Sequence, residues 1–119
     1  MPFNIVLVDD HKLVRDGVKT ILERGSEFHV IGEAENGDDA VKAYTAQRPE
    51  LVLLDLIMPG KNGLAVLAEI KALDPAAKVV MVTAVEQDIL SEQLIGKGAI
   101  GVLHKPFLYA ELEAILKQQ

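Results

Sequence analysis

The sequence contains no cysteine and no tryptophan, and its only aromatic residues are three phenylalanines and two tyrosines. Without cysteine it can form neither disulfides nor thiolate metal sites. So few aromatic side chains do not supply a surface on which nucleic-acid bases could stack. No apolar run approaches the roughly 18 residues of a membrane helix, and the first residues do not resemble a signal peptide. We therefore expect a cytoplasmic protein that does not enter a membrane.

Basic residues are also in the minority. Twelve lysines and arginines stand against 18 aspartates and glutamates, which gives a net charge of −6. This balance argues against nucleic-acid binding by the domain itself and suits a protein that handles cations or docks on protein partners. Half of the 119 residues are apolar, enough for one well-buried core. We expect residues 1–119 to form a single domain, with no output domain attached.

Short apolar runs rich in valine, isoleucine and leucine alternate with amphipathic stretches along the whole chain. Such runs are typical of strands that helices cover on both faces. The expected strands are residues 5–8, 30–34, 51–54, 79–82 and 101–103, and the expected helices are 13–23, 39–47, 64–73, 87–95 and 109–117. Asp38 and Asn62 are the expected helix starts, and the first helix has one apolar stripe, made of Leu13, Val14, Val18, Ile21 and Leu22. This alternation predicts an α/β fold with a doubly wound, five-stranded parallel sheet and five helices.

Polar residues follow the apolar runs at the points where strands would end. Asp9 and Asp10 follow the first strand, Asp55 the third, Thr83 the fourth and Lys105 the last. The flavodoxin-like strand order 2-1-3-4-5 places the first and third strands side by side, so that the three aspartates converge at the edge where ligands bind. Carboxylates crowded in this way repel one another unless a cation neutralises them. Oxygen ligands at such a cleft suit Mg²⁺.

The individual residue types indicate how this edge could handle a phosphoryl group. Asp55 ends the most apolar strand and is the best candidate nucleophile. Lys105 would place a positive charge on a phosphoryl oxygen, Thr83 would donate its hydroxyl, and the small Ala84 leaves room for the group. Each residue alone has an ordinary structural explanation, such as a helix cap, a strand former or an exposed turn. Their occurrence together, at one edge of one sheet, favours a functional site.

Four motifs together resemble the receiver domain of two-component response regulators over essentially the whole chain. They are Val8-Asp9-Asp10, the segment from Asp55 to Gly63, Thr83-Ala84, and Lys105-Pro106-Phe107 preceded by Gly98-Ala99. The resemblance implies that Asp55 accepts a phosphoryl group from the phosphohistidine of a histidine kinase or phosphotransfer protein, or from a small acyl phosphate. It implies a Mg²⁺ ion bound directly by Asp10 and mainly through water by Asp9, with Asp55 and the backbone carbonyl of Ile57 as the other metal-binding groups. It also implies a cis peptide bond before Pro106.

The chain departs from the family pattern at two places. Val102 occupies the position where many receivers carry a switching tyrosine or phenylalanine, and a short β-branched side chain cannot swing in the same way. We expect Val102 to pack the strand. Ile57 and Val85 occupy positions that are often polar in members with a short-lived phosphoaspartate. Two apolar side chains there would exclude the attacking water, which predicts slow autodephosphorylation, unless both point away from Asp55.

His11 directly follows the acidic pair and has two interpretations. An imidazole is a metal ligand, but it suits softer metals than Mg²⁺. We therefore expect His11 to border the first helix. His29 and His104 lie in or beside expected strands, and we interpret both as structural.

The resemblance also implies where a signal would leave the domain. The face formed by the fourth helix, the last strand and the fifth helix is the usual signalling surface of the family. Apolar residues could remain exposed there and favour a partner or a homodimer, namely Ile89, Leu90, Ile95 and Leu108. The output is expected to be a separate protein, or a domain of a longer regulator from which this chain derives.

Two other functions compete with a phosphoacceptor that catalyses only its own phosphorylation and dephosphorylation. One is a receiver-like module that binds partners without phosphorylation, although all five polar site residues are present. The other is an enzyme, a Mg²⁺-dependent aspartyl phosphohydrolase. This alternative lacks a second acid–base carboxylate two residues after Asp55, where Ile57 stands.

Overall fold

The computed structural model describes residues 3–25, 27–58, 60–84, 88–105 and 107–118, with the side chains of residues 88 and 89 left out. Five parallel strands form one sheet in the order β2-β1-β3-β4-β5. The strands are β1 (Phe3–Val8), β2 (Phe28–Ala34), β3 (Leu51–Asp55), β4 (Val79–Thr83) and β5 (Gly101–His104). The helices are α1 (Lys12–Leu22), α2 (Gly37–Gln47), α3 (Gly63–Leu73), α4 (Asp88–Gly96) and α5 (Tyr109–Lys117). The predicted flavodoxin-like fold is confirmed, with each predicted element within two residues of its observed bounds.

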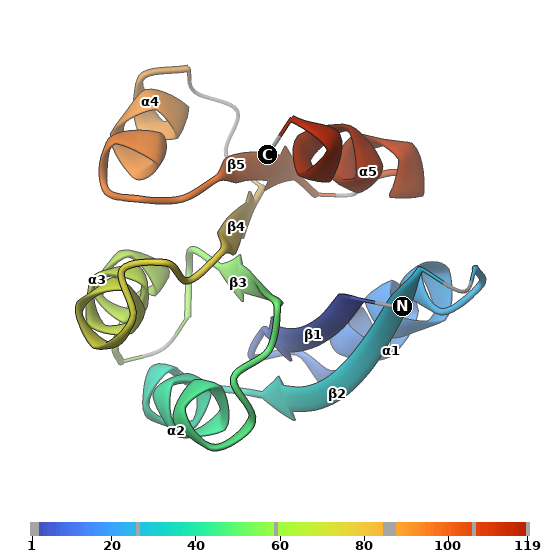
Figure 1. The fold of residues 1–119 in the computed structure, drawn as a ribbon, viewed down its shortest axis with the longest axis horizontal. Coiled ribbons are helices and arrows are strands. Elements are labelled where there is room, and N and C mark those ends of the chain that lie inside the picture. Colours follow the sequence, from blue (N-terminus) through green and yellow to red (C-terminus); the bar gives the residue numbers. More distant parts are fainter. Residues whose placement is uncertain (1–2, 26, 59, 85–87, 106, 119) are drawn as a thin grey trace.

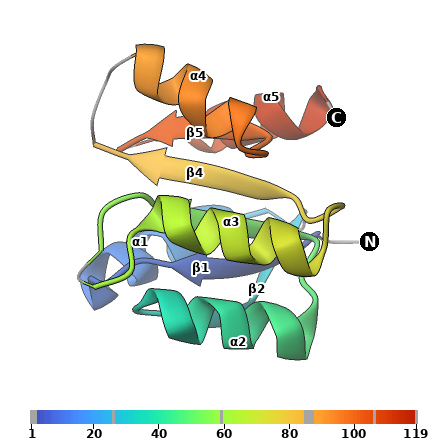
Figure 2. The same cartoon turned by 90° about the vertical axis from the view of Figure 1, so that its left-hand side faces the viewer.

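The sheet lies between two layers of helices. Figure 1 shows α2, α3 and α4 on one side of the sheet and α1 and α5 on the other, and Figure 2 shows the three-helix side from the front. Side chains alternate along each strand, so Val6 and Val8 join the core under α2, α3 and α4, whereas Ile5 and Leu7 join the core under α1 and α5. Both faces of the sheet are therefore apolar, as the continuous runs of valine, isoleucine and leucine predict.

Helix caps explain where two helices begin. Asn62 caps α3 as predicted, because its side chain accepts a hydrogen bond from the backbone N–H of Ala65 at 3.0 Å. Helix α2 begins earlier than the predicted start at Asp38. Asn36 is the capping residue, and its Oδ1 accepts a hydrogen bond from the N–H of Asp39 at 2.8 Å. The helix therefore begins two residues earlier than predicted, because Asn36 and not Asp38 accepts a hydrogen bond from a free N–H group of the first turn.

The predicted apolar stripe of α1 is wrong at its N-terminal end. Leu13 is 86% exposed and Val14 is 37% exposed, whereas Leu22 is fully buried.

Among the described residues, no helix is long and apolar enough to cross a membrane.

Candidate functional site

The carboxyl ends of four strands bring the predicted site residues to one edge of the sheet. Strand β1 leads directly into Asp9 and Asp10, β3 ends at Asp55, β4 ends at Thr83, and Lys105 follows β5. The ends are aligned because Asp55 pairs with Val82 and Thr83 with His104 across the parallel ladders. Asp9, Asp55 and Thr83 are buried at this edge.

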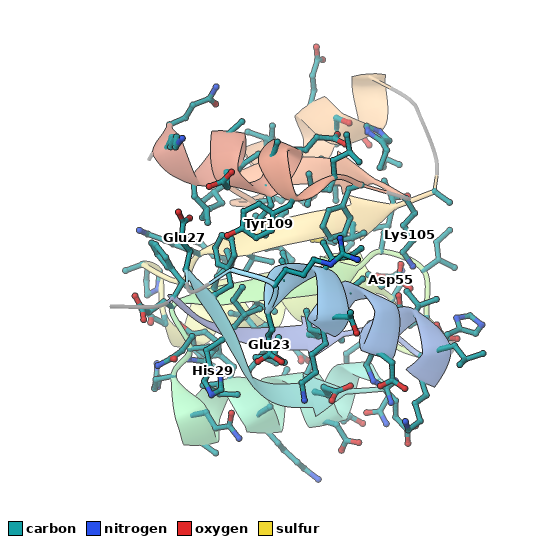
Figure 3. The ribbon with its side chains drawn as sticks, turned by 90° about the vertical axis from the view of Figure 1, so that its right-hand side faces the viewer. Glu23, Glu27, His29, Asp55, Lys105 and Tyr109 are labelled. Carbon is teal, nitrogen blue, oxygen red and sulfur yellow. The ribbon has the colours of Figure 1, made fainter. Side chains whose placement is uncertain are left out.

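The Lys105 side chain joins two of the aspartates. Its Nζ lies 2.8 Å from Asp9 Oδ2 and 3.2 Å from Asp55 Oδ2. Figure 3 shows the Asp55 and Lys105 side chains next to each other at the same end of the sheet. The Lys105 N–H donates a hydrogen bond of 2.8 Å to the Thr83 carbonyl, so the position of the lysine is tied to the end of β4. One ammonium therefore neutralises part of the charge of a buried carboxylate pair.

The two buried aspartates have opposite pKa shifts. Burial raises the pKa of Asp55, and the charge of Asp9 adds to this rise, although Lys105 partly offsets both effects. Burial also acts to raise the pKa of Asp9, but hydrogen bonds from Lys105 and from the His11 N–H outweigh it and lower the pKa. Lys105 lies closer to Asp9 than to Asp55, and this difference in distance agrees with the two directions. Asp55 is thus the carboxylate whose charge is less well compensated.

We expect Asp55→Asn and Asp9→Asn to change the free energy of unfolding in opposite directions. The raised pKa of Asp55 means that its charge costs stability once the pH exceeds that raised value, so at pH 7 the Asp55→Asn protein should be more stable by about 1 kcal/mol. The lowered pKa of Asp9 means that its charge contributes stability above the unfolded value of 3.8, so Asp9→Asn should be less stable by about 1–2 kcal/mol.

Thermal melts of both variants and the native chain between pH 3 and pH 7 test this difference. The advantage of Asp55→Asn should disappear as the pH falls from the raised pKa of Asp55 towards 3.8, and the deficit of Asp9→Asn should begin to shrink only below pH 3.8. If the melting temperatures of both variants changed equally and in the same direction at pH 7, the opposite pKa shifts of Asp9 and Asp55 would be contradicted.

Asp10 and its neighbours provide oxygen and nitrogen atoms for a cation. The Asp10 Oδ1 atom is buried, yet it accepts no hydrogen bond from any residue that the structure describes. Ligand atoms of Asp9, Asp10 and His11 lie within 4.8 Å of one another. A buried carboxylate oxygen without a donor is costly, and a divalent cation would compensate it. These residues therefore fit a bound Mg²⁺ ion.

Two basic residues that the sequence analysis did not single out hold the loops of the site. The Arg15 guanidinium donates to the Asp9 carbonyl at 2.6 Å and to Glu33 at 3.0 Å, which ties the β1–α1 loop to β2. The Lys61 ammonium lies 2.9 Å from Asp38 and 2.8 Å from Glu69, which ties the β3–α3 loop to α2 and α3. Lys61 lies within the receiver-like segment from Asp55 to Gly63, but the sequence does not predict the contacts of either residue, because a charged residue on a helix or in a loop is ordinarily solvated.

The residues expected to govern lifetime and switching have distinct surroundings. The Ile57 N–H donates to Asp55 Oδ1 at 3.3 Å, while the Ile57 side chain is 63% exposed. Val102 is half-buried and packs against the core under α2, α3 and α4, and Ala84 is exposed. Val85 and Pro106, for which we predict a lifetime role and a cis peptide bond, lie outside the described residues.

An apolar cavity of about 410 Å³ opens beside the charged edge. Asp9 and Lys105 line one part of it, and the rest is lined mainly by apolar side chains of α1, the sheet and Phe107. The exposed Leu13 and Val14 belong to this lining. A partner protein that reaches Asp55 from this edge would therefore meet an apolar surface beside the charges.

Comparison with known proteins agrees with the geometry of this edge. Residues 5–117 match the family model described as the response regulator receiver domain. The chemotaxis protein CheY of Listeria monocytogenes is 44% identical over 103 residues, which are 87% of this chain and 86% of that protein. The response regulator UvrY of Escherichia coli O6:H1 is 40% identical over 102 residues, 86% of this chain but 47% of that protein.

A solved structure shares the same architecture. A chain in the crystal structure of the CheX–CheY–BeF3–Mg complex from Borrelia burgdorferi superposes with a TM-score of 0.90 at 28% identity, covering 99% of this chain and 89% of that chain. The predicted resemblance is thereby confirmed at the level of the family. Receiver domains are signalling phosphoacceptors rather than classical enzymes, and this chain belongs to the response regulator receiver domain family.

Proposed function

We propose that the protein takes a phosphoryl group onto Asp55 in a Mg²⁺-dependent reaction and signals through the resulting change in protein contacts. The position of the Lys105 ammonium carries this proposal, because it lies between the buried carboxylates of Asp9 and Asp55 at the open edge of the sheet. Asp9, Asp10, Asp55 and the Ile57 carbonyl would hold the ion. When bound, Mg²⁺ supplies positive charge that offsets the repulsion between the carboxylates and an incoming phosphoryl group.

The chemistry requires one bond to form and one to break. A carboxylate oxygen of Asp55 attacks the phosphorus of the donor, the P–O bond to Asp55 forms, and the bond from phosphorus to the donor's nitrogen or oxygen breaks with its electron pair leaving on the donor. Lys105 neutralises a phosphoryl oxygen, and the Thr83 hydroxyl donates to another. Burial of Asp55 raises the pKa of its carboxyl, so the attacking oxygen is more basic than that of an exposed aspartate.

The proposed donors are the phosphohistidine of a histidine kinase or phosphotransfer protein and, as a simple substitute, a small acyl phosphate. The apolar cavity lined by Leu13, Val14 and Phe107 supports a protein donor, because Asp9 and Lys105 also line it. A docked helix could cover the apolar lining while its phosphohistidine faces Asp55.

The proposed output surface is the face formed by α4, β5 and α5. Lys105 follows β5 directly and its N–H is bonded to the end of β4, so a change in the contacts of Lys105 acts on both strands. Ile95 and Leu108 leave apolar area on this side, with 53% and 70% of their surface exposed. We propose that a downstream protein, an output domain of the same regulator or a second copy binds there.

We further propose a long-lived phosphoaspartate. The Ile57 N–H donates a hydrogen bond to the Asp55 carboxylate, which keeps Ile57 next to Asp55, and its apolar side chain offers no polar group to orient water. The rate at which a labelled protein loses its phosphoryl mass measures this lifetime.

Intact-mass tracking with acetyl phosphate tests the phosphoacceptor proposal. We expect the native chain to gain the mass of one phosphoryl group when Mg²⁺ is present and to gain none when EDTA removes the ion, because the carboxylate pair then repels the anionic donor. Adding excess Mg²⁺ to the chelated sample should restore the gain. Labelling that proceeds equally in EDTA would contradict the proposed role of the metal.

If the native chain gains no phosphoryl mass from acetyl phosphate, a second donor should be tested. Incubation with phosphorylated histidine kinase should then transfer the label if the domain depends strictly on its kinase. No transfer from either donor would overturn the proposal in favour of a receiver-like module that binds partners without phosphorylation. Continuous release of phosphate beyond one equivalent at a high rate would instead favour the phosphohydrolase.

A further inference from the structure

His11 occupies the N-cap position of α1 without acting as a side-chain cap. Its backbone is extended, with φ −104° and ψ 115°, and its side chain makes no capping hydrogen bond. The imidazole is directed instead at the acidic pair. Its Nδ1 lies 3.1 Å from Asp10 Oδ1 and 3.5 Å from Asp9 Oδ1. The prediction that His11 borders the first helix is therefore correct for its backbone, but it does not explain the side chain.

These distances match the spacing of ligands around one metal ion. Bonds of about 2.0–2.1 Å place neighbouring ligands about 3.0 Å apart in octahedral and about 3.4 Å apart in tetrahedral geometry. The Asp10 Oδ1 atom near the imidazole is buried and accepts no hydrogen bond within the described part of the chain. Nδ1 of a neutral imidazole and this carboxylate oxygen are both possible ligand atoms. One cation bound to both would compensate the buried oxygen.

The two oxygens of Asp9 face different partners. Its Oδ2 is bonded to Lys105, whereas its Oδ1 accepts the His11 N–H at 2.9 Å and lies near the imidazole. A carboxylate oxygen has lone pairs for both a hydrogen bond and a metal ion. The side of Asp9 that faces His11 can thus bind a cation while Lys105 remains in place.

We propose that His11 is a further protein ligand of the cation site, beside Asp9 and Asp10, so that the site binds nitrogen-preferring divalent ions such as Zn²⁺ and Co²⁺ more tightly than Mg²⁺. This inference rests on the proposed function for the location of the cation and adds a selectivity to it. Carboxylate and water oxygens suit Mg²⁺, whereas an imidazole adds affinity for Co²⁺, Ni²⁺ and Zn²⁺. Two carboxylates and one neutral imidazole form a ligand set that zinc commonly accepts with a water in its fourth position.

A second histidine–carboxylate pair provides an internal control. His29 Nδ1 lies 3.3 Å from Glu23 Oε2, and 61% of the His29 side chain is exposed, compared with 70% for His11. Figure 3 shows Glu23 and His29 together, well away from Asp55 and Lys105. The His29 imidazole lies near one carboxylate, whereas the His11 imidazole lies near two. Attraction between a histidine and a carboxylate is therefore possible at both positions, but only the His11 position has enough ligands for the proposed metal site.

Competition with a chromophoric chelator measures the affinities of the unphosphorylated chain for Zn²⁺, Co²⁺ and Mg²⁺. We expect His11→Ala to weaken Zn²⁺ and Co²⁺ binding about tenfold or more and Mg²⁺ binding by a smaller factor. Asp10→Asn should weaken all three, and His29→Ala should weaken none. Zn²⁺ should also shift the imidazole ¹⁵N resonances of His11 and leave those of His29 in place.

Equal Zn²⁺ affinities of the His11→Ala and native chains, or an equal loss in His29→Ala, would overturn the inference. Mg²⁺-dependent labelling of the native chain with a phosphoryl group shows separately whether the proposed phosphoacceptor function holds. Labelling together with unchanged Zn²⁺ binding in His11→Ala refutes only the role of His11. A chain that binds Zn²⁺ through His11 but accepts no phosphoryl group refutes only the phosphoacceptor role.

Discussion

Asp55→Asn is expected to abolish phosphoryl uptake from acetyl phosphate, with a labelling rate at least about a thousandfold below that of the native chain. The amide oxygen of asparagine is a far weaker nucleophile than a carboxylate oxygen. We do not expect Asp9 to replace Asp55, because Lys105 lies closer to Asp9 Oδ2 than to Asp55 Oδ2 and the lowered pKa of Asp9 makes its carboxylate less basic. Intact-mass spectrometry at saturating Mg²⁺ measures the difference.

Asp16→Asn is the matched control for this experiment. Asp16 lies on α1 and pairs with Lys12 at the surface, at 2.9 Å, so the same chemical change occurs away from the sheet edge. This variant should be labelled like the native chain. If the Asp55→Asn protein gained a phosphoryl group at the native rate, another residue would be the acceptor, and peptide mapping of the labelled protein would identify it.

Gly63→Ala is expected to destabilise the fold by about 2–4 kcal/mol and to lower the melting temperature by about 10 °C. A Cβ at Gly63 would collide with the Asp55 carbonyl and would lie 2.7 Å from Leu56 Cα. Both obstacles are backbone atoms, which cannot rotate away as a long side chain can. The Gly63 N–H also donates to the Leu56 carbonyl at 2.8 Å, so α3 starts directly against the segment that follows Asp55.

Gly17→Ala is the matched control, and we expect the opposite sign. Gly17 lies within α1, and nothing is within 4 Å of a Cβ built there. Alanine in an open position within a helix should stabilise the protein by about 0.5–1 kcal/mol relative to glycine. Thermal or urea unfolding measures both variants. A Gly63→Ala protein as stable as the native chain would mean that the β3–α3 segment can move away from α3 at little cost.

The distribution of polar residues along the chain was sufficient to predict the fold and the side chains that meet at one edge of the sheet. Each strand is a continuous apolar run, and parallel strands place their carboxyl ends at the same edge of a sheet. Asp9, Asp55, Thr83 and Lys105 could therefore be assigned to one site before any distance was known. The same reasoning located the start of α3 at Asn62, because its capping depends on neighbours in sequence.

The sequence did not reveal which apolar side chains would be buried or which charged side chains would pair with residues of other elements. Leu13 fits the helical stripe of α1 by spacing, yet it is exposed in the lining of the apolar cavity. Arg15 lies outside the receiver-like motifs and Lys61 lies inside one, but the sequence predicts the contacts of neither residue with glutamates and aspartates from other parts of the chain.

The sequence by itself determined the order of the elements and the set of side chains at the sheet edge, because both depend on local periodicity and strand direction. Only the tertiary structure decided how those side chains share their charges. Lys105 is 96 residues from Asp9 in sequence and lies nearer to Asp9 than to Asp55, so it offsets only part of the rise in the pKa of Asp55 that burial causes. The direction of the His11 imidazole, towards two carboxylates rather than the helix start, was likewise visible only in the structure. Electrostatic interactions fall off with distance in space, and the sequence alone does not contain that distance.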